Sequence, residues 1–264
     1  MTPLMLLASL FLLLQSPASA AQSVLVTGAA GKTGSIIYKS LKAKGVNVKA
    51  SVYSLSEAKA SLGCTKCDPS EGIYVGDVTQ PETLTAAMEG VGTVLCAVGA
   101  GEGMNATQQE DIEFTGVVNQ VAALTKANPA AKPAELKFVL CSSMGTTNPK
   151  PAPYEGGPVL FWKLNAEAFL STSGLTSVVV KPGGLMDGPA NNMTLVWGHH
   201  DELFATVNPP VINRADVAAV MVTAALSAQA GDAPLRFDLV SKPGPPPKSL
   251  QALLKAARWP WQQK

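Results

Sequence analysis

The sequence predicts a doubly wound α/β domain with a mainly parallel sheet and helices on both faces. Short apolar, β-branched runs alternate with helical stretches along the chain, and the first run leads directly into a glycine-rich turn. Several of the runs are continuously apolar, which is typical of strands buried on both faces in a parallel sheet. The alternation of strand and helix places helices on those two faces. The sequence shows no internal repeat and no linker, so we expect one domain over residues 21–264.

The expected strands are the apolar or alternating runs at 23–27, 46–53, 73–75, 93–98, 136–141, 176–180 and 235–240. The expected helices are 32–44, 80–89, 111–128, 161–171, 216–228 and 249–258. The first four helices are followed by residues that end a helix, namely Gly45, Gly90, Pro129 and Gly174. Residues 185–213 break this rhythm. We expect them to form an irregular insertion over the carboxyl ends of the strands, where such folds bind ligands.

Composition and charge exclude several classes of protein. The 264 residues are 47% hydrophobic and 15% charged, with a net charge of +1, whereas disordered chains combine low hydrophobicity with high net charge. A nucleic-acid partner is not expected, because binding phosphate backbones requires a basic surface. Four cysteines are too few for a disulfide-stabilised scaffold of this length. Nothing in the composition indicates the oligomeric state.

The N-terminus resembles a targeting segment. Residues 4–14 are uncharged and mostly apolar, and Ala18-Ser19-Ala20 follows at the position of a cleavage site. This combination is typical of a secretory signal peptide, and the run is shorter than the roughly 20 residues that span a bilayer. We therefore expect residues 1–20 to be a signal peptide and predict no stable membrane span. The expected destination is the ER lumen or secretion, or alternatively an organelle reached through that route.

A glycine-rich turn joins the first strand to the first helix. Its G-x-x-G-x-x-G spacing places Gly28 in the tight turn, Gly31 where a pyrophosphate approaches the backbone, and Gly34 where helix and strand pack closely. The following helix N-terminus presents free N–H groups and a positive dipole end to phosphate. This pattern predicts a dinucleotide site. The expected contacts in the turn are Gly28, Ala30, Gly31, Lys32, Thr33 and Gly34.

The T-G-x-x-G-x-x-G spacing resembles the short-chain dehydrogenase/reductase superfamily. Ser143 after the fifth strand, Lys163 on a helix, a P-G-G turn at 182–184 and R-x-D-V-A at 214–218 then follow in the order of its atypical members, which are related to NmrA-like and NAD(P)H-binding proteins. The resemblance covers most of residues 23–261. It implies a Rossmann-type fold, a nicotinamide dinucleotide and a small-molecule substrate. The further cofactor contacts that it implies are Tyr53, Asp77, Val78, Val98, Gly99, Lys163, Pro182, Gly183 and Gly184.

The end of the second strand bears on the choice of dinucleotide. NAD enzymes usually carry Asp or Glu there for the ribose 2′-hydroxyl, but no acid occurs before Glu57. Related NADP-binding proteins often place Arg where Tyr53 stands in this chain. Lys32 and Lys59 are near enough in sequence to meet a 2′-phosphate. We expect NADP, with NAD as the alternative.

The catalytic tyrosine of short-chain dehydrogenases is absent. It stands four residues before the helix lysine and exchanges the proton, but Val159 occupies that position, and Tyr154 lies beyond Pro158. We therefore expect hydride transfer to a flavin, quinone or conjugated acceptor that takes its proton from water. The resemblance makes Ser143 the substrate contact and Lys163 the ribose contact. One alternative is a non-catalytic sensor or assembly factor of NmrA-like type, and another is a binding module without nucleotide.

Two further residue pairs are of types that bind metal ions. Cys64 and Cys67 form a C-x-x-C without the additional ligands that zinc needs, so we expect loop cysteines, which an oxidising lumen could join in a disulfide. His199 and His200 are adjacent, and adjacent side chains on a regular element point apart. We therefore predict no metal site.

Overall fold

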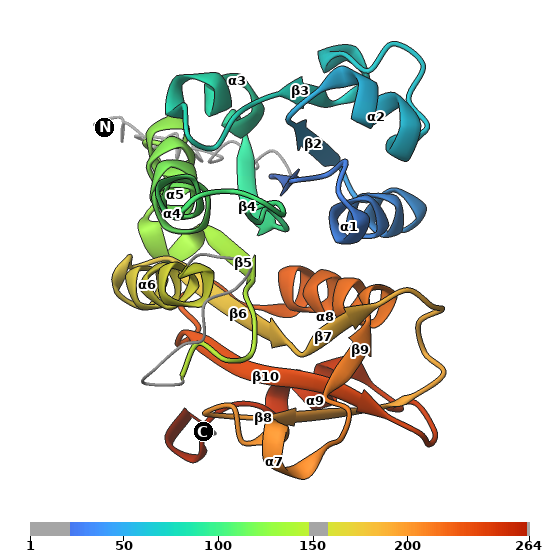
Figure 1. Ribbon diagram of the computed structural model, residues 1–264. Helices are drawn as coiled ribbons and strands as arrows, with labels where there is room; N and C mark the ends of the chain where they lie inside the picture. The colour runs from blue at the N-terminus through green and yellow to red at the C-terminus, as the bar shows by residue number, and fades with distance from the viewer. Residues whose placement is uncertain (1–21, 148–157, 263–264) are drawn as a thin grey trace, which may run out of the picture.

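A computed structural model describes residues 22–147 and 158–262, so segment 1–20 and Tyr154 lie outside the described residues. Within these ranges one eight-stranded sheet has the order β3-β2-β1-β4-β5-β6-β10-β8, and only β8 is antiparallel to its neighbour (Figure 1). Its strands are β1 (Ser23–Thr27), β2 (Val48–Val52), β3 (Ile73–Val75), β4 (Val91–Cys96), β5 (Lys137–Cys141), β6 (Thr176–Pro182), β8 (Thr194–Gly198) and β10 (Leu235–Lys242). The predicted doubly wound, mainly parallel fold is confirmed.

Helices cover both faces of this sheet. They are α1 (Lys32–Ala43), α2 (Leu55–Leu62), α3 (Thr85–Met88), α4 (Ala106–Glu110), α5 (Gly116–Ala127), α6 (Val159–Thr172), α7 (Leu203–Thr206), α8 (Arg214–Ser227) and α9 (Leu250–Ala256). Ile37 of α1 and Met221 of α8 belong to one buried core cluster, whereas Leu124 of α5 and Leu170 of α6 belong to a second. Figure 1 shows these helix pairs on opposite sides of the sheet. β1, β4 and β6 are buried along their whole length, as expected of strands covered on both faces.

The order of the strands reverses between β1 and β4. From β1 the chain proceeds outward to β2 and β3, and then returns to β4 on the other side of β1. Val26 of β1 is therefore in register with Ala50 of β2 on one side and with Leu95 of β4 on the other. The loops after β1 and β4 diverge above this point, and such a switch is where open α/β sheets bind ligands.

The segment 185–213 is more regular than expected. It contains most of β7 (Gly184–Met186) together with β8, α7 and β9 (Val211–Asn213). β8 pairs with β10 and forms the edge of the main sheet, and β7 pairs with β9. The expectation of an irregular segment was wrong because strands of three to five residues are stabilised by a distant partner, which their own periodicity does not reveal.

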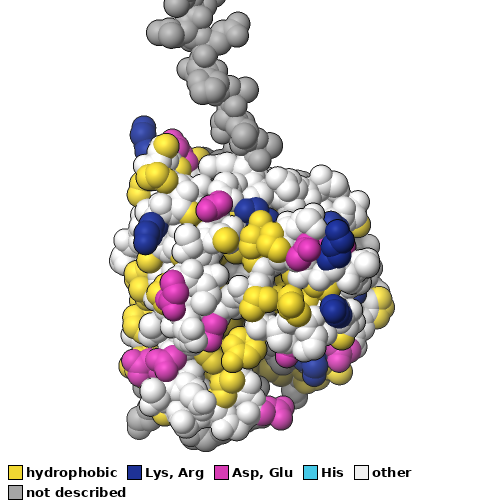
Figure 2. Space-filling model, turned by 90° about the horizontal axis from the view of Figure 1, so that it is seen from above, with side chains coloured by type: hydrophobic (Ala, Val, Ile, Leu, Met, Phe, Trp, Pro, Cys, Tyr) yellow, Lys and Arg dark blue, Asp and Glu magenta, His cyan; other side chains and the backbone are white. Residues whose placement is uncertain are grey.

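The molecular surface carries few charges of either sign. On the face in Figure 2, basic and acidic side chains are scattered among apolar ones, in keeping with a net charge of +1. Among the described residues, no helix combines the length and apolar character needed to cross a bilayer.

Candidate active site

The turn after β1 exposes the amino end of α1. Gly28 has a positive φ of 68°, which a glycine adopts without strain. Gly31 is the N-cap residue, no side chain bonds to the first amides of the helix, and no acid lies in its first turn. These amides are therefore available to a phosphate. A Cβ atom on Gly34 would collide with the carbonyl oxygen of Gly28, so the third glycine allows the helix to pack on the turn.

Two cavities lie on either side of this turn, at the carboxyl ends of the strands. The adenosine-side cavity, as we name it, has a volume of about 540 Å³ and adjoins the ends of β1, β2 and β3. The nicotinamide-side cavity has about 530 Å³ and adjoins β5 and β6. Both are lined by Ala97, Val98 and Gly99 after β4. Two adjoining cavities beside one phosphate-binding turn have the arrangement that a dinucleotide needs.

Most of the predicted site residues line one of these cavities. The adenosine-side cavity is lined by Gly28, Ala30, Gly31, Tyr53, Asp77 and Val78 of the predicted set. The nicotinamide-side cavity is lined by Thr33, Ser143, Lys163, Pro182, Gly183 and Gly184 of that set. Val98 and Gly99 line both. Lys32 and Gly34 line neither, because Lys32 is exposed at the start of α1 and Gly34 packs against the turn.

Lys163 is paired with an acid that the sequence pattern did not single out. Its Nζ atom lies 2.6 Å from Oε2 of Glu113, which is 5% exposed and also lines the nicotinamide-side cavity. The backbone N–H of Ala100 donates to the other oxygen of this carboxylate, at 2.8 Å. Burial by itself lowers the pKa of Lys163, but the charge and the hydrogen bond of Glu113 outweigh it and raise that pKa above its ordinary value. The cavity wall thus holds an ammonium–carboxylate pair.

A π-helical turn, Asp111–Thr115, directs Glu113 into the cavity. It lies between α4 and α5, and π-helical turns are frequently found at functional sites. Asp111 and Ile112 of the same turn line the adenosine-side cavity. No pattern in the sequence singles out Glu113, because the π-helical turn before α5 interrupts the regular spacing of a helix.

The two serines after β5 have different surroundings. Ser143 lines the nicotinamide-side cavity, and its hydroxyl donates to the carbonyl oxygen of Met144 at 2.8 Å. The hydroxyl of Ser142 donates to the buried carboxylate of Glu167. Ser143 is therefore the serine whose hydroxyl lies at the cavity, where it can exchange its bond to a neighbouring carbonyl for one to a ligand.

A buried ion pair fixes the loop that carries Ser143. Lys181 of β6 has no exposed surface, and its Nζ atom lies 3.0 Å from carboxylate oxygens of both Asp201 and Asp238. Asp201 in turn accepts hydrogen bonds from the backbone N–H groups of Gly145 at 2.9 Å and Thr147 at 2.7 Å. Residues from β6, β10 and the turn after β8 thus hold the loop after β5 in place. None of the three charged residues was predicted from the sequence.

The adenosine-side cavity is acidic. Its described lining includes Glu57, Asp77 and Asp111 but no lysine or arginine. Asp77 accepts from the backbone N–H of Thr79 at 2.9 Å and from its hydroxyl at 2.8 Å, so it also stabilises the turn after β3. Lys59, expected near a 2′-phosphate, is exposed and outside this lining.

Comparison with known proteins identifies this arrangement. A chloroplastic protein of Arabidopsis thaliana is 32% identical over 88% of this chain and 74% of its own length. Sanguinarine reductase of Eschscholzia californica is 29% identical over 90% of this chain and 97% of its own length. A solved structure of an NAD-dependent epimerase/dehydratase type from Bacillus halodurans has the same fold, with a TM-score of 0.68, 21% identity and coverage of 89% of this chain and 99% of that one.

The sequence profile of one family, described as NAD(P)H-binding, matches residues 28–228. The match begins at the first glycine of the turn and ends at the last residues of α8, so it includes both cavities. Fold, glycine turn and profile agree with the atypical short-chain dehydrogenase/reductase resemblance and with a nicotinamide dinucleotide as cofactor. This chain belongs to the NAD(P)H-binding family.

Proposed function

We propose that this protein is an NAD(P)H-dependent reductase that transfers hydride to a small conjugated acceptor without a tyrosine proton donor. The observation that carries the proposal is the Lys163–Glu113 pair in the wall of the nicotinamide-side cavity. A reductase needs a charge-stabilising group beside the reactive half of the cofactor, and this pair supplies one. The curated relative named sanguinarine reductase supports a reductase activity.

The bound cofactor supplies the hydride, and the residues of this chain orient the reactants. Lys163, kept protonated by Glu113, donates hydrogen bonds to the nicotinamide ribose and places a positive charge beside the ring. Ser143 donates its hydroxyl hydrogen to the acceptor. The acceptor takes up one hydride and one proton, and the proton comes from water. Ketone reduction, which depends on a strong proton donor, is therefore not the preferred chemistry.

The substrate end of the cavity is formed by apolar side chains around one cation. Met144, Leu160, Leu185 and Phe204 line it together with Arg214. The Arg214 guanidinium lies 2.7 Å from the exposed carboxylate of Asp187. A flat, partly apolar molecule such as a quinone or flavin fits these surroundings, with its polar edge toward Arg214.

Glu57 is the residue that we expect to discriminate between the two dinucleotides. NADPH differs from NADH by a 2′-phosphate, which a neighbouring carboxylate repels. Lys32 and Lys59, the basis for expecting NADP, lie outside the cavity lining. We propose that the protein accepts both cofactors, and that NADPH binding relies on these exposed lysines against the charge of Glu57.

A non-catalytic sensor is the second candidate, and the presence of Val159 in place of the tyrosine favours it. Steady-state oxidation of NADH and NADPH with a panel of quinones, flavins and conjugated ketones separates the two functions. A reductase shows turnover that saturates with at least one acceptor and falls in Lys163→Ala. Saturable binding of a dinucleotide with no turnover across the panel would select the sensor.

The relatives also bear on the destination to which the N-terminal segment directs the chain. The relatives give the secretory destination no support, since the Arabidopsis thaliana protein described above is named as chloroplastic. We propose that residues 1–20 belong to a segment that directs the chain to an organelle, and that the organelle is a plastid. Imaging of the chain fused at its C-terminus to a fluorescent protein, with and without residues 1–20, tests this. Fluorescence in the ER would overturn the plastid proposal.

A further inference from the structure

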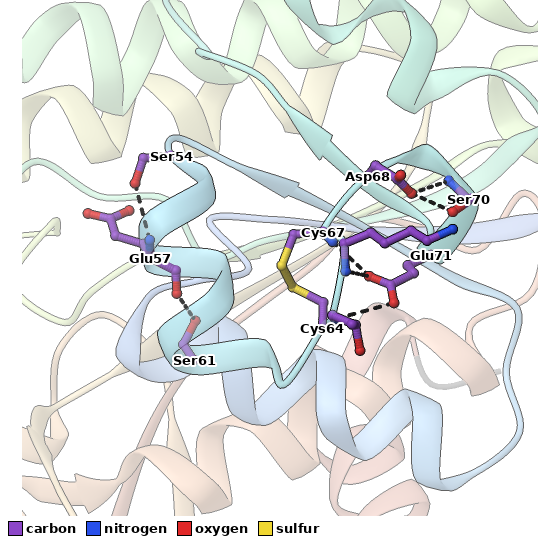
Figure 3. Close-up of a disulfide and its surroundings, with 10 residues drawn as sticks. Ser54, Glu57, Ser61, Cys64, Cys67, Asp68, Ser70 and Glu71 are labelled. Carbon is purple, nitrogen blue, oxygen red and sulfur yellow. Dashed lines mark hydrogen bonds between the residues drawn. A yellow bond between two sulfur atoms is a disulfide. The ribbon is translucent and has the colours of Figure 1, made fainter.

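Cys64 and Cys67 form a disulfide in the connection between α2 and β3 (Figure 3). Cys64 is half-buried and Cys67 is 1% exposed. The connection is bounded by Gly63 and Gly72, which have positive φ values of 70° and 74°. Glycine adopts positive φ values without strain, so a sharp turn at each end separates the disulfide loop from α2 and from β3.

Glu71 holds this loop through the backbone rather than through the sulfurs. Its carboxylate accepts hydrogen bonds from the N–H groups of Thr65 at 3.2 Å, Lys66 at 2.9 Å and Cys67 at 2.7 Å. Figure 3 shows the Glu71 carboxylate pointing toward the backbone of the loop, on the side opposite the two sulfur atoms. These bonds do not require the disulfide. The loop therefore has a means of keeping the two thiols close after reduction, so that the bond can form again.

Of the two cysteines, Cys64 lines a cavity that the structure describes. A hollow of about 290 Å³ is lined by Cys64 and Glu71, and on its other side by Tyr38, Lys39 and Lys42 of α1. Cys67 is not part of its lining. Two lysines in the same lining as Cys64 favour the approach of an anionic thiolate to this cysteine. An incoming thiolate should therefore attack Cys64 and displace Cys67.

The loop connects two of the segments that line the adenosine-side cavity. Tyr53, before α2, and Glu57, in its first turn, belong to one segment, and Gly76–Val78, after β3, belong to the other. The disulfide restrains the chain between them. Both ends of the disulfide loop thus lead, through α2 and β3, to residues of the adenosine-side cavity.

We propose that Cys64–Cys67 is a thiol–disulfide exchange site for a dithiol reductant, and that its reduction weakens dinucleotide binding. A thiolate of the reductant attacks Sγ of Cys64 and forms a mixed disulfide, while Cys67 leaves as a thiolate and takes a proton. The second thiol of the reductant then attacks the mixed disulfide and releases Cys64. The protein gains two thiols and the reductant becomes a disulfide. The effect on binding rests on the proposed dinucleotide site, whereas the exchange chemistry does not.

The exchange is tested on the full chain under native conditions, with dithiothreitol as the reductant. Maleimide labelling and peptide mapping should find Cys64 and Cys67 labelled before the protein unfolds, ahead of the buried Cys96. In single variants, Cys64 of Cys67→Ser should react with an aromatic disulfide reagent at least about tenfold faster than Cys67 of Cys64→Ser, because only Cys64 lines the hollow. A disulfide that resists dithiothreitol until the protein unfolds, or equal rates for the two variants, would overturn the proposal.

The coupling is tested by calorimetric titration of NADH and NADPH into the oxidised and the reduced protein. We expect the Kd of the reduced form to be higher by about fivefold, a modest allosteric coupling. Cys64→Ser/Cys67→Ser should bind as the reduced form does and should not respond to dithiothreitol. Equal affinities of the two redox forms would refute the coupling. An oxidised protein that binds neither dinucleotide would instead refute the proposed function and leave the labelling result standing.

Discussion

Val159 lies one helical turn before Lys163 on α6, and both side chains line the nicotinamide-side cavity. Residues four apart on a helix share a face, so Val159 occupies the place from which a tyrosine of the short-chain dehydrogenase type would act beside the lysine. The chain retains the lysine and the cavity but presents an aliphatic surface. The missing hydroxyl is therefore a local difference in chemistry and not a consequence of a different fold.

Introducing a tyrosine at this position should restore a proton donor. We expect Val159→Tyr to gain at least about tenfold in the reduction of simple ketones, since a positioned general acid contributes about 10²–10⁴-fold and the new side chain is not optimally placed. Val159→Phe is the matched control, because it adds the same ring without the hydroxyl. Equal ketone reduction by the two variants, measured by NADPH oxidation, would contradict the assignment of this position.

The pairing of Lys163 with Glu113 predicts a change in pH dependence. Burial lowers the pKa of Lys163, and the Glu113 charge and hydrogen bond raise it by more. In Glu113→Gln the lowering influence of burial is no longer outweighed by Glu113, so the ammonium loses its proton at a lower pH. The alkaline limb of the pH–rate profile should therefore move to lower pH, and along that limb turnover should fall about tenfold per pH unit. Glu110→Gln, at the end of α4 and outside both cavities, should leave the profile unchanged.

Several parts of this site were accessible from the sequence and others were not. The glycine turn, Lys163 and Ser143 lie in short patterns whose residues are neighbours in sequence, and their cavities form where strands end. Glu113 is different, because a π-helical turn rotates it into the cavity, and a helical pattern assumes regular spacing. Lys181 is different again, since its partners Asp201 and Asp238 come from distant segments. Strand register alone brings the charges of Lys181 and Asp238 together.

The acidic lining of the adenosine-side cavity predicts how cofactor preference can be changed. Removing the negative charge in Glu57→Gln should lower the Kd of NADPH by about threefold to tenfold, because the repulsion of the 2′-phosphate is partly screened by solvent. The Kd of NADH should change little or rise. Glu82→Gln, an exposed acid outside the lining, serves as the control. An unchanged ratio of the two Kd values would show that Glu57 does not face the ribose.

The second glycine of the turn provides a test of the phosphate site itself. Gly31→Asp places a carboxylate at the amino end of α1, where the free amides are expected to hold the pyrophosphate. We expect affinity for both dinucleotides to fall by at least about tenfold, since like charges meet at short distance. Gly31→Ala adds the Cβ without the charge, and that atom would lie 3.2 Å from the carbonyl oxygen of Gly28. Comparison of the two variants by calorimetry separates repulsion from crowding.

Asp201 links the position of the Ser143 loop to stability in acid. Burial raises the pKa of Asp201, but hydrogen bonds from Gly145 and Thr147 and the charge of Lys181 outweigh it and hold that pKa below its ordinary value. The stabilisation from this carboxylate is therefore fully present above the ordinary value of 3.8 and is lost as the pH falls through the lower folded-state pKa.

Removing the Asp201 charge should flatten this acid dependence. Asp201→Asn leaves Lys181 with one carboxylate partner, so we expect a lower free energy of unfolding at pH 7 and a shallower decline between about pH 5 and pH 2. Asp187→Asn is the matched control, because that carboxylate is 81% exposed although it also pairs with a cation. Urea unfolding midpoints over this pH range measure both variants. Parallel acid limbs for Asp201→Asn and the unchanged protein would mean that Asp201 titrates alike in the folded and unfolded states, and that the buried pair does not hold the loop through its charge.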